Sequence, residues 1–492
     1  MRLKSSATFL AALLAASALV SAAQAQTPAP AAAPAPAARA SVVPLPMQSQ
    51  SQQRTLADAL AITYSTNPTL QASRAALRAV DEGVPQALSG WRPQVQFAAT
   101  AGTADGVSSN RIGGIGSSSQ ATRGVNTQTL QVVQPLFRGG ATRAGTNQAE
   151  NRVFAQRATL LAAEQTALNG AATAYVSVIQ ATQVLALREN NIQVLSRQLQ
   201  ATRDRFRVGE ITRTDVAQAE ASLAGATADR QTAESALQTA RSLYAQFIGE
   251  LPGRLVEPQP LRLPAKTLDE ARELAANNNP NVVAALFSDA AAKDNVDVQF
   301  ARLMPTLSVQ GTISRNEDSQ TKNLTSKASQ VVLSTTVPIY QGGSEYAAVR
   351  QAKQQQQQSR KQVDDARRTA VQALTQAWTT YQSTRAAIES TRQQIRANEI
   401  ALEGVQREAI VGSRTTLDVL NAEQTLLNSR VTLVQNLANL VNTSYAVAAA
   451  SGRLTARDLS LDVPLYDETA YYNAVRNRWI GTADQATDQP GR

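Results

Sequence analysis

The side chains able to do chemistry in this chain are acids, amines, guanidinium groups and hydroxyls, because its 492 residues include neither cysteine nor histidine. Ser-His-Asp and Cys-His catalysis are therefore excluded, and the commonest ligand of transition metals is missing. The sequence also shows no nucleophile–base pair, no metal-ligand cluster and no phosphate-binding loop. We predict no enzyme activity, no cofactor and no metal, which leaves electrostatics as the chemistry of this chain.

Acidic residues recur at matching places after two glycines. Val208-Gly209 is followed by Asp215, and Val411-Gly412, 203 residues further on, is followed by Asp418. Each glycine predicts the end of a helix. The Thr and Asp residues that follow predict the start of the next helix, where the macrodipole favours a negative charge. Each Asp is therefore either an ordinary helix-start residue or part of a functional charge cluster.

These two turns belong to a duplication of most of the chain. Asn67-Pro68 recurs as Asn279-Pro280, 212 residues later, and segment 134–140 recurs as 337–343, 203 residues later. The offset changes once, so one loop of the first copy is predicted to be nine residues longer. A duplication of this size indicates two similar units that share one architecture.

Each copy has the pattern of a helix, two strands, a very long helix, a tight turn and a returning helix. We predict copy one over residues 54–252, copy two over 267–452, and a connector between the copies at 253–266. The Gly/Ser/Asn-rich stretch 102–124 is predicted to be the longer loop. The predicted strands are 94–103, 125–135, 306–314 and 329–338, the long helices 141–208 and 344–411, and the returning helices 212–249 and 415–450.

The two ends of the chain differ in composition from the copies. Residues 1–25 combine early basic residues, an apolar run and an Ala-x-Ala site, which indicates a secretory signal peptide. The apolar run is too short and Ala-rich for a membrane anchor. Residues 26–53 are a Pro/Ala/Gln-rich flexible lead-in, and 453–492 form a C-terminal tail. No later segment has about 18 uninterrupted apolar residues, so we expect no membrane helix.

The predicted strands alternate between apolar and polar residues. Val95, Phe97 and Ala99 form one face in copy one, and Leu307 and Val309 form it in copy two. Strands of about ten residues cross a bilayer when tilted. Four strands cannot close a barrel, and lipid tolerates no open sheet edge. Several chains must then contribute, and three chains give twelve strands around a water-filled lumen. The alternative is a small hairpin packed on the helices.

The long helices carry narrow apolar stripes with heptad spacing, such as Leu195, Leu199, Thr202 and Phe206 in copy one. Their other faces are rich in Gln, Arg, Asn and Ser, which suits a hollow cylinder of coiled coils that is wet on both sides. We therefore predict a mostly α fold with a small membrane β-barrel. The net charge of +9 is scattered among acids, so no nucleic-acid surface is expected.

The combined motifs resemble the TolC family of outer-membrane efflux ducts. They are the Asn-Pro pair, the proline before each first strand, the Pro-x-x-x-Gly-Gly turn and the Val-Gly turn followed by Thr-x-Leu-Asp-Val-Leu-Asn-Ala, over about residues 54–452. The tail from Tyr466 to Gly481 is similar to alphaproteobacterial TolC-type proteins. The resemblance implies a homotrimer in the outer membrane of a Gram-negative bacterium, with a twelve-stranded barrel on an α-helical periplasmic tunnel and no catalysis. It also implies a periplasmic adaptor (membrane fusion protein) and an inner-membrane ABC exporter or proton-driven drug pump as partners.

The resemblance also implies roles for particular residues at the periplasmic tip. Asp418 matches an acidic ring at the tunnel entrance, and Asn421 stands where the family has a second acid, so the ring carries less charge here. Arg414 and Asp215 match a latch that links neighbouring helix pairs across the closed tip, while Ala409 replaces a supporting tyrosine. The turns expected to contact the adaptor are those at Val208, Gly209, Val411 and Gly412.

Two questions stay open at the level of sequence. The main alternative to a duct is a structural trimeric coiled-coil protein of the cell envelope that transports nothing. Mid-chain strand pairs and the duplication disfavour it, because stalk proteins keep their membrane strands at one end. Within the duct interpretation, type I protein secretion, multidrug efflux and metal efflux are equally compatible with an open lumen.

Overall fold

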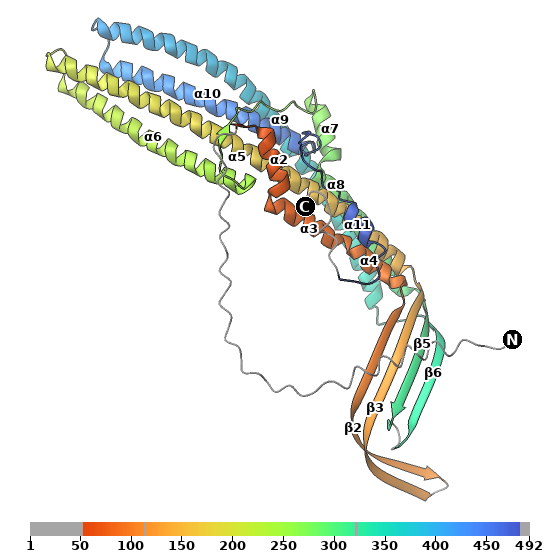
Figure 1. Cartoon of the computed structure of the whole chain (residues 1–492). Coiled ribbons are helices and arrows are strands. Elements are labelled where there is room, and N and C mark those ends of the chain that lie inside the picture. The colour runs from red at the N-terminus through yellow and green to blue at the C-terminus, as the bar shows by residue number, and fades with distance from the viewer. Residues whose placement is uncertain (1–52, 113–114, 320–322, 483–492) are drawn as a thin grey trace, which may run out of the picture. The chain divides into compact units, whose positions relative to one another are not determined.

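A computed structural model describes residues 53–112, 115–319 and 323–482 (Figure 1). The predicted signal peptide and the lead-in up to residue 52 lie outside the described residues, as does the stretch 483–492 of the tail. All described residues belong to one compact unit, 46–492. In chain order the elements are β1 (Gln53–Arg54), α2 (Leu56–Thr66), α3 (Pro68–Asp81), α4 (Gly83–Leu88), η2 (Ser89–Trp91), β2 (Gln94–Ile112), β3 (Ile115–Arg138), α5 (Ala141–Arg207), α6 (Arg213–Ile248), β4 (Arg254–Leu255), α7 (Leu268–Asn278), α8 (Pro280–Phe300), η3 (Ala301–Leu303), β5 (Thr306–Glu317), β6 (Thr325–Thr336), α9 (Ser344–Ile410), α10 (Thr416–Ala450) and α11 (Ala470–Val475).

The repeated Asn-Pro pair positions the first helices of each copy. Asn67 caps α3 and Asn279 caps α8, with a proline at the first helical position in both cases. Each side chain also donates its amide to the end of the returning helix of its own copy. Asn67 Nδ2 lies 3.1 Å from the Phe247 carbonyl oxygen, and Asn279 Nδ2 lies 3.0 Å from that of Ala450. The motif therefore holds the beginning and the end of each helical unit together.

Four strands form one antiparallel sheet in the order β2-β3-β5-β6. β5 and β6 have 12 residues each, but β2 and β3 have 19 and 24. The longer loop predicted at 102–124 is wrong, because Gly102 pairs with Val125 and the ladder continues as far as Ile112 and Ile115. Antiparallel pairing satisfies the backbone groups of these Gly/Ser/Asn residues despite their low strand propensity. The insertion in copy one therefore lengthens a hairpin.

Two helices of 67 residues, α5 and α9, follow the two hairpins. At 1.5 Å per residue each is about 100 Å long. Both start after a glycine with positive φ, Gly140 at 89° and Gly343 at 84°, a conformation that glycine adopts at little cost. The sheet and the turns that end these helices consequently lie at opposite ends of the helical hairpins (Figure 1).

Both long helices end in the same hydrogen-bonded turn. Gly209 has φ of 81° and Gly412 has φ of 82°. The backbone N–H of Gly209 donates to the Phe206 carbonyl oxygen at 2.9 Å, and that of Glu210 donates to Arg205 at 3.0 Å. This pair of bonds is a Schellman motif, and the same two bonds recur at Gly412 and its successor. The duplicated sequence thus gives two equivalent helix ends.

The helices pair as two hairpins, α5 with α6 and α9 with α10, and α5 also packs along α10. Of the predicted seam of α5, Leu195, Leu199 and Thr202 are buried. Phe206, also assigned to the seam, is 45% exposed. It lies in the last turn of α5, next to the solvent-exposed turn. The apolar stripe therefore ends about one turn before the helix does.

The largest core lies where α2, α3 and the C-terminal tail pack on the middle of α5. Leu60, Leu70 and Leu77 of the first helices and Leu168 of α5 are at most 1% exposed, and Leu454 of the tail joins them. The connector is tied to the same region, because β4 pairs with β1 in parallel. This core joins segments from both ends of the described chain.

One part of α5 differs from the sequence expectation that no helix could span a membrane. By length and composition, α5 contains a window apolar enough to cross a bilayer, and 33% of that window is buried within the chain. The helix also carries Leu168 and Tyr175, both fully buried in the core. A core helix has the same composition, so this window is weak evidence for a membrane span.

Candidate functional site

The sheet has one continuous apolar face. The register places Phe97 opposite Leu130, Leu130 opposite Ile313, and Val95 on the same side opposite Val132. The exposed fractions are 66% for Phe97 and 67% for Val95. The large apolar side chains of this face are Val95, Phe97, Leu130, Val132, Leu307, Val309, Ile313, Val331 and Leu333. In water such a patch is unfavourable, whereas it matches the lipid-facing surface of a transmembrane sheet.

The opposite face of the same sheet is mostly polar. Gln96 lies opposite Gln131, which lies opposite Thr312, which lies opposite Gln330. Ser308 and Ser334 form another pair on this side, and Val133 and Val332 interrupt it. A sheet with one apolar and one hydrated face can separate lipid from water.

The sheet is open at both sides. Within the described part of the chain, β2 pairs only with β3, and β6 pairs only with β5. Both outer edges therefore present unpaired backbone groups, each of which costs on the order of several kcal/mol in lipid. One chain alone cannot be the final form of a membrane sheet.

At the other end of the helices, Asp418 caps the start of α10. Its Oδ2 accepts the backbone N–H of Thr415 at 3.0 Å and the Thr415 hydroxyl at 2.9 Å. The backbone bond, helped by the hydroxyl, holds the pKa of Asp418 below its usual value. Asp418 is therefore a permanent negative charge near neutral pH. Asn421 is exposed one helical turn along the same face of α10.

Asp215 has the same environment in copy one. Its Oδ2 accepts the Thr212 hydroxyl at 2.7 Å and the Thr212 backbone N–H at 3.0 Å. These bonds, the hydroxyl first, lower the pKa of Asp215. Two capping boxes therefore hold two carboxylates in equivalent places, and both remain ionised.

The predicted latch residues Arg414 and Asp215 do not meet within one chain. Arg414 Nε lies 2.9 Å from Glu408 Oε2, across the turn of copy two. Asp215 is occupied by its cap. Any Arg414–Asp215 pair must then form between chains, and this assignment stays a prediction.

Sequence reasoning missed a salt bridge across each turn. In copy one, Arg205 Nη2 lies 2.5 Å from Glu210 Oε1, and in copy two Glu408 takes the place of Arg205 and binds Arg414. Each turn thus has one salt bridge, but the helix residue is the positive partner in copy one and the negative partner in copy two. The signal was present in the duplication, because positions 205 and 408 are 203 residues apart and carry opposite charges.

The predicted adaptor-contact turns are open to solvent. Val208 and Val411 are each 78% exposed, and the glycine that follows each has space for a Cβ. Ile410, which the sequence analysis did not single out, is 80% exposed beside Val411. Copy one has Arg207 at that place. The turn of copy two is therefore more apolar than that of copy one.

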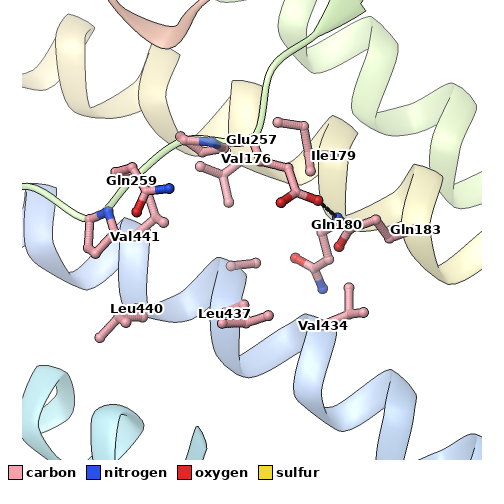
Figure 2. A pocket seen from close by; sticks show the side chains of 13 residues that line it. Val176, Ile179, Gln180, Gln183, Glu257, Gln259, Val434, Leu437, Leu440 and Val441 are labelled. Carbon is pink, nitrogen blue, oxygen red and sulfur yellow. Dashed lines mark hydrogen bonds between the residues drawn. The ribbon is translucent and has the colours of Figure 1, made fainter.

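A small cavity of about 180 Å³ lies between α5, α10 and the connector (Figure 2). Val176 and Ile179 of α5 and Leu437 and Val441 of α10 line it. Ligand sites usually measure ~300–1,000 Å³, so this cavity is smaller than a usual ligand site. In the described part of the chain, no group of three or more acids could hold a metal ion.

Comparison with known proteins identifies the family of this chain. The family profile described as outer membrane efflux protein matches residues 59–250 and 271–453, one match in each copy. The chain belongs to the outer membrane efflux protein family. The resemblance to TolC-type ducts seen in the sequence is confirmed.

Individual relatives cover most of the chain. It is 36% identical over 428 residues to the outer membrane efflux protein BepC of Brucella suis, covering 87% of this chain and 91% of that protein. It is 27% identical to the outer membrane protein TolC of Escherichia coli, covering 80% and 81%. Among solved structures, the outer membrane protein VceC of Vibrio cholerae matches with a TM-score of 0.69 at 21% identity, covering 81% of this chain and 96% of that one. The fold is therefore that of the outer membrane efflux proteins, which are channel proteins.

Proposed function

We propose that three copies of this chain assemble into a passive exit duct of the outer membrane. Each chain contributes four strands to a closed twelve-stranded barrel and two helical hairpins to a periplasmic tunnel. Residues 1–25 direct export, and copies 54–252 and 267–452 each supply one hairpin of each kind. The chain has no catalytic role in this assembly.

The single observation that carries this proposal is the open sheet with one apolar face. β6 of one chain pairing with β2 of the next closes the ring and satisfies both free edges. A twelve-residue strand measures about 40 Å, which is sufficient to cross the ~30 Å hydrocarbon core even when tilted. The polar face with Gln96, Gln131 and Gln330 then lines a wet lumen.

The tunnel proposal rests on the helices. Their length of about 100 Å extends the duct away from the membrane, towards an adaptor and an inner-membrane ABC exporter or proton-driven pump. The exposed Val208 and Val411 turns are the surface we assign to the adaptor. The names of the family and of BepC speak of efflux, whereas two other relatives are named for protease secretion, so both tasks stay open for this duct.

Three Asp418 side chains around the axis form the entrance ring of this assembly. Each is ionised and partly exposed, so the ring attracts cations and repels anions. Arg414 of one helix pair and Asp215 of its neighbour bridge the closed tip. An exposed pair contributes only about 0–1 kcal/mol, but three symmetric pairs bias the closed state together.

Conductance in planar bilayers tests the duct directly. We expect discrete ion-conducting steps, with about one channel for three chains in cross-linked, purified protein. A protein that forms coiled-coil trimers but no conducting unit would instead be the structural envelope protein that the sequence left open.

The latch has its own test in the same bilayers. Arg414→Ala and Asp215→Ala should both raise conductance by opening the tip. Glu408→Gln is the matched control, because it breaks the bridge within the chain and keeps Arg414 available for a neighbour. Equal conductance for all three variants and the parent would remove the latch assignment and leave the duct proposal intact.

A further inference from the structure

The C-terminal tail runs back along copy one and is fixed there by several polar contacts. The backbone N–H of Tyr466 donates to the Tyr64 hydroxyl at 3.0 Å. The Tyr471 hydroxyl donates to Glu82 at 2.9 Å, and Arg476 lies 2.9 Å from a Glu150 oxygen. Figure 1 shows α11 beside α3. The tail is thus a fixed part of the helical region.

The last described part of this tail reaches the foot of the sheet. Arg92, two residues before β2, donates from Nη1 to the carbonyl oxygen of Arg478 at 2.7 Å. Its guanidinium also lies 5.1 Å from the centre of the Trp479 ring. Trp479 is nevertheless 64% exposed, and Ile480 is 88% exposed. Two large apolar side chains are therefore held in place without a cover from the described part of their own chain.

The same level of the molecule carries other exposed apolar residues. Each lies within a few residues of the foot of a strand, where helices give way to the sheet. They are Trp91 (43% exposed), Leu136 and Phe137 (47% each), Ile339 (88%) and Tyr340 (76%). Trp and Tyr collect at membrane–water interfaces, where one side of the ring meets lipid and the other meets water.

We propose that Trp479-Ile480 inserts into the periplasmic leaflet of the outer membrane and anchors the tail to phospholipid. Two observations select lipid as the occupant. The pair lies at the level of the strand feet, because Arg92, the neighbour of Trp91, contacts it, and Arg92 and Arg478 lie beside it to meet lipid phosphates. This inference rests on the proposed membrane sheet. It adds a contact made by a segment outside the strands, present once in each chain.

Tryptophan fluorescence tests the anchor, since the chain has three tryptophans, Trp91, Trp378 and Trp479. The double variant Trp91→Phe/Trp378→Phe keeps Trp479 alone. In phosphatidylethanolamine/phosphatidylglycerol nanodiscs, phospholipid brominated near the top of its acyl chains should quench this emission at least about twofold. In Trp91→Phe/Trp479→Phe, the remaining Trp378 is 3% exposed in the helical core and should not be quenched.

Two further variants distinguish an error in the proposed anchor from an error in the proposed membrane sheet. With all three tryptophans changed to Phe, Phe97→Trp reports on the lipid-facing side of the sheet, and Val331→Trp is a second probe of that side. Quenching at these positions without quenching of Trp479 would overturn the anchor alone, and a neighbouring chain would then be what covers Trp479. Absence of quenching at all three positions would overturn the membrane sheet as well.

Discussion

The long and returning helices have nearly the same length in the two copies, whereas the β-hairpins differ. α5 and α9 both have 67 residues, and α6 and α10 have 36 and 35. The hairpin strands have 19 and 24 residues in copy one and 12 each in copy two. α5 packs along α10, the partner of α9, so a change of length in one hairpin alone would shift its heptad contacts with the other. In the proposed barrel the strands need only cross the bilayer, so the number of strand residues beyond it is free to vary.

The copies also differ where the sheet meets the long helix. Gly139 and Gly342 occupy equivalent places and both have positive φ, 60° and 66°. A Cβ on Gly139 would lie 2.5 Å from the Ala301 carbonyl oxygen and from Met304 Cβ, whereas Gly342 has open space around it. In copy one, Gly139 thus packs closely against Ala301 and Met304 of copy two. In copy two, Gly342 has no such close neighbour among the described residues of its own chain.

The largest expected loss of stability comes from filling the close contact at Gly139. Gly139→Ala adds a steric clash to an unfavourable φ, and we expect a loss of about 2–4 kcal/mol. Gly342→Ala is the matched control, with only the backbone term of about 1–2 kcal/mol. The measurement is the apparent melting temperature of the purified protein in detergent. Equal losses for both variants would show that the two junctions are equivalent after all.

A second contrast lies in the first helices. Asp81 is fully buried without a hydrogen-bond partner for either oxygen, whereas Lys293, its equivalent in copy two, is exposed. Burial raises the pKa of Asp81 to about 7, opposed mainly by the nearby charge of Arg157 and Arg78 and reinforced by Glu82 and Glu468. The folded state therefore keeps a proton that the unfolded chain loses near its ordinary pKa.

This contrast predicts the pH dependence of stability. Asp81 contributes stability below about pH 4 that is lost as the pH rises through about 7. Asp81→Asn should remove that loss and raise stability at pH 8 by about 1–3 kcal/mol relative to the parent. Melting temperatures at pH 5 and pH 8 check this, with Lys293→Gln as a control that should change neither. A parent whose stability is the same at both pH values would contradict the assignment.

The two acidic turns allow a smaller and more specific prediction. Asp418→Asn and Asp215→Asn remove equivalent capping carboxylates, so any loss of helix stability should be similar. Only Asp418→Asn should lower the preference for cations, about twofold in the permeability ratio, if Asp418 alone lies at the axis. The reversal potential under a salt gradient measures this ratio. Equal changes in both variants would place both residues at the entrance.

The smallest effect is expected from shortening the longer hairpin. Replacing residues 106–121 by Asn-Gly leaves a first strand from Gln94 to Asp105, as long as β5, with a two-residue turn suited to a hairpin. Trimer yield and melting temperature should stay close to the parent. A strong loss of assembly would mean that the added residues contact neighbouring chains.

The duplication made much of the fold predictable. The Asn-Pro caps, the glycine turns and the long proline-free segments each occur twice, so one copy supported the interpretation of the other. The 102–124 stretch was misjudged because its Gly and Ser residues have the composition of a loop, while cross-strand pairing decides its structure. The charge-reversed bridge at Arg205 and Glu408 was missed because it depends on contacts across a turn. Trp479 belongs to no periodic pattern in the sequence. Only its position beside Arg92 in the structure shows that it lies at the foot of the sheet.

The position of Leu454 in the core of copy one has a consequence for biogenesis. Leu454 lies beyond the C-terminal end of α10, yet it packs with Leu60, Leu70 and Leu77 near the beginning of the chain. The first unit cannot complete its interior while the remainder is still being translocated. We therefore expect the subunit to complete this core only after the segment around Leu454 has emerged in the periplasm.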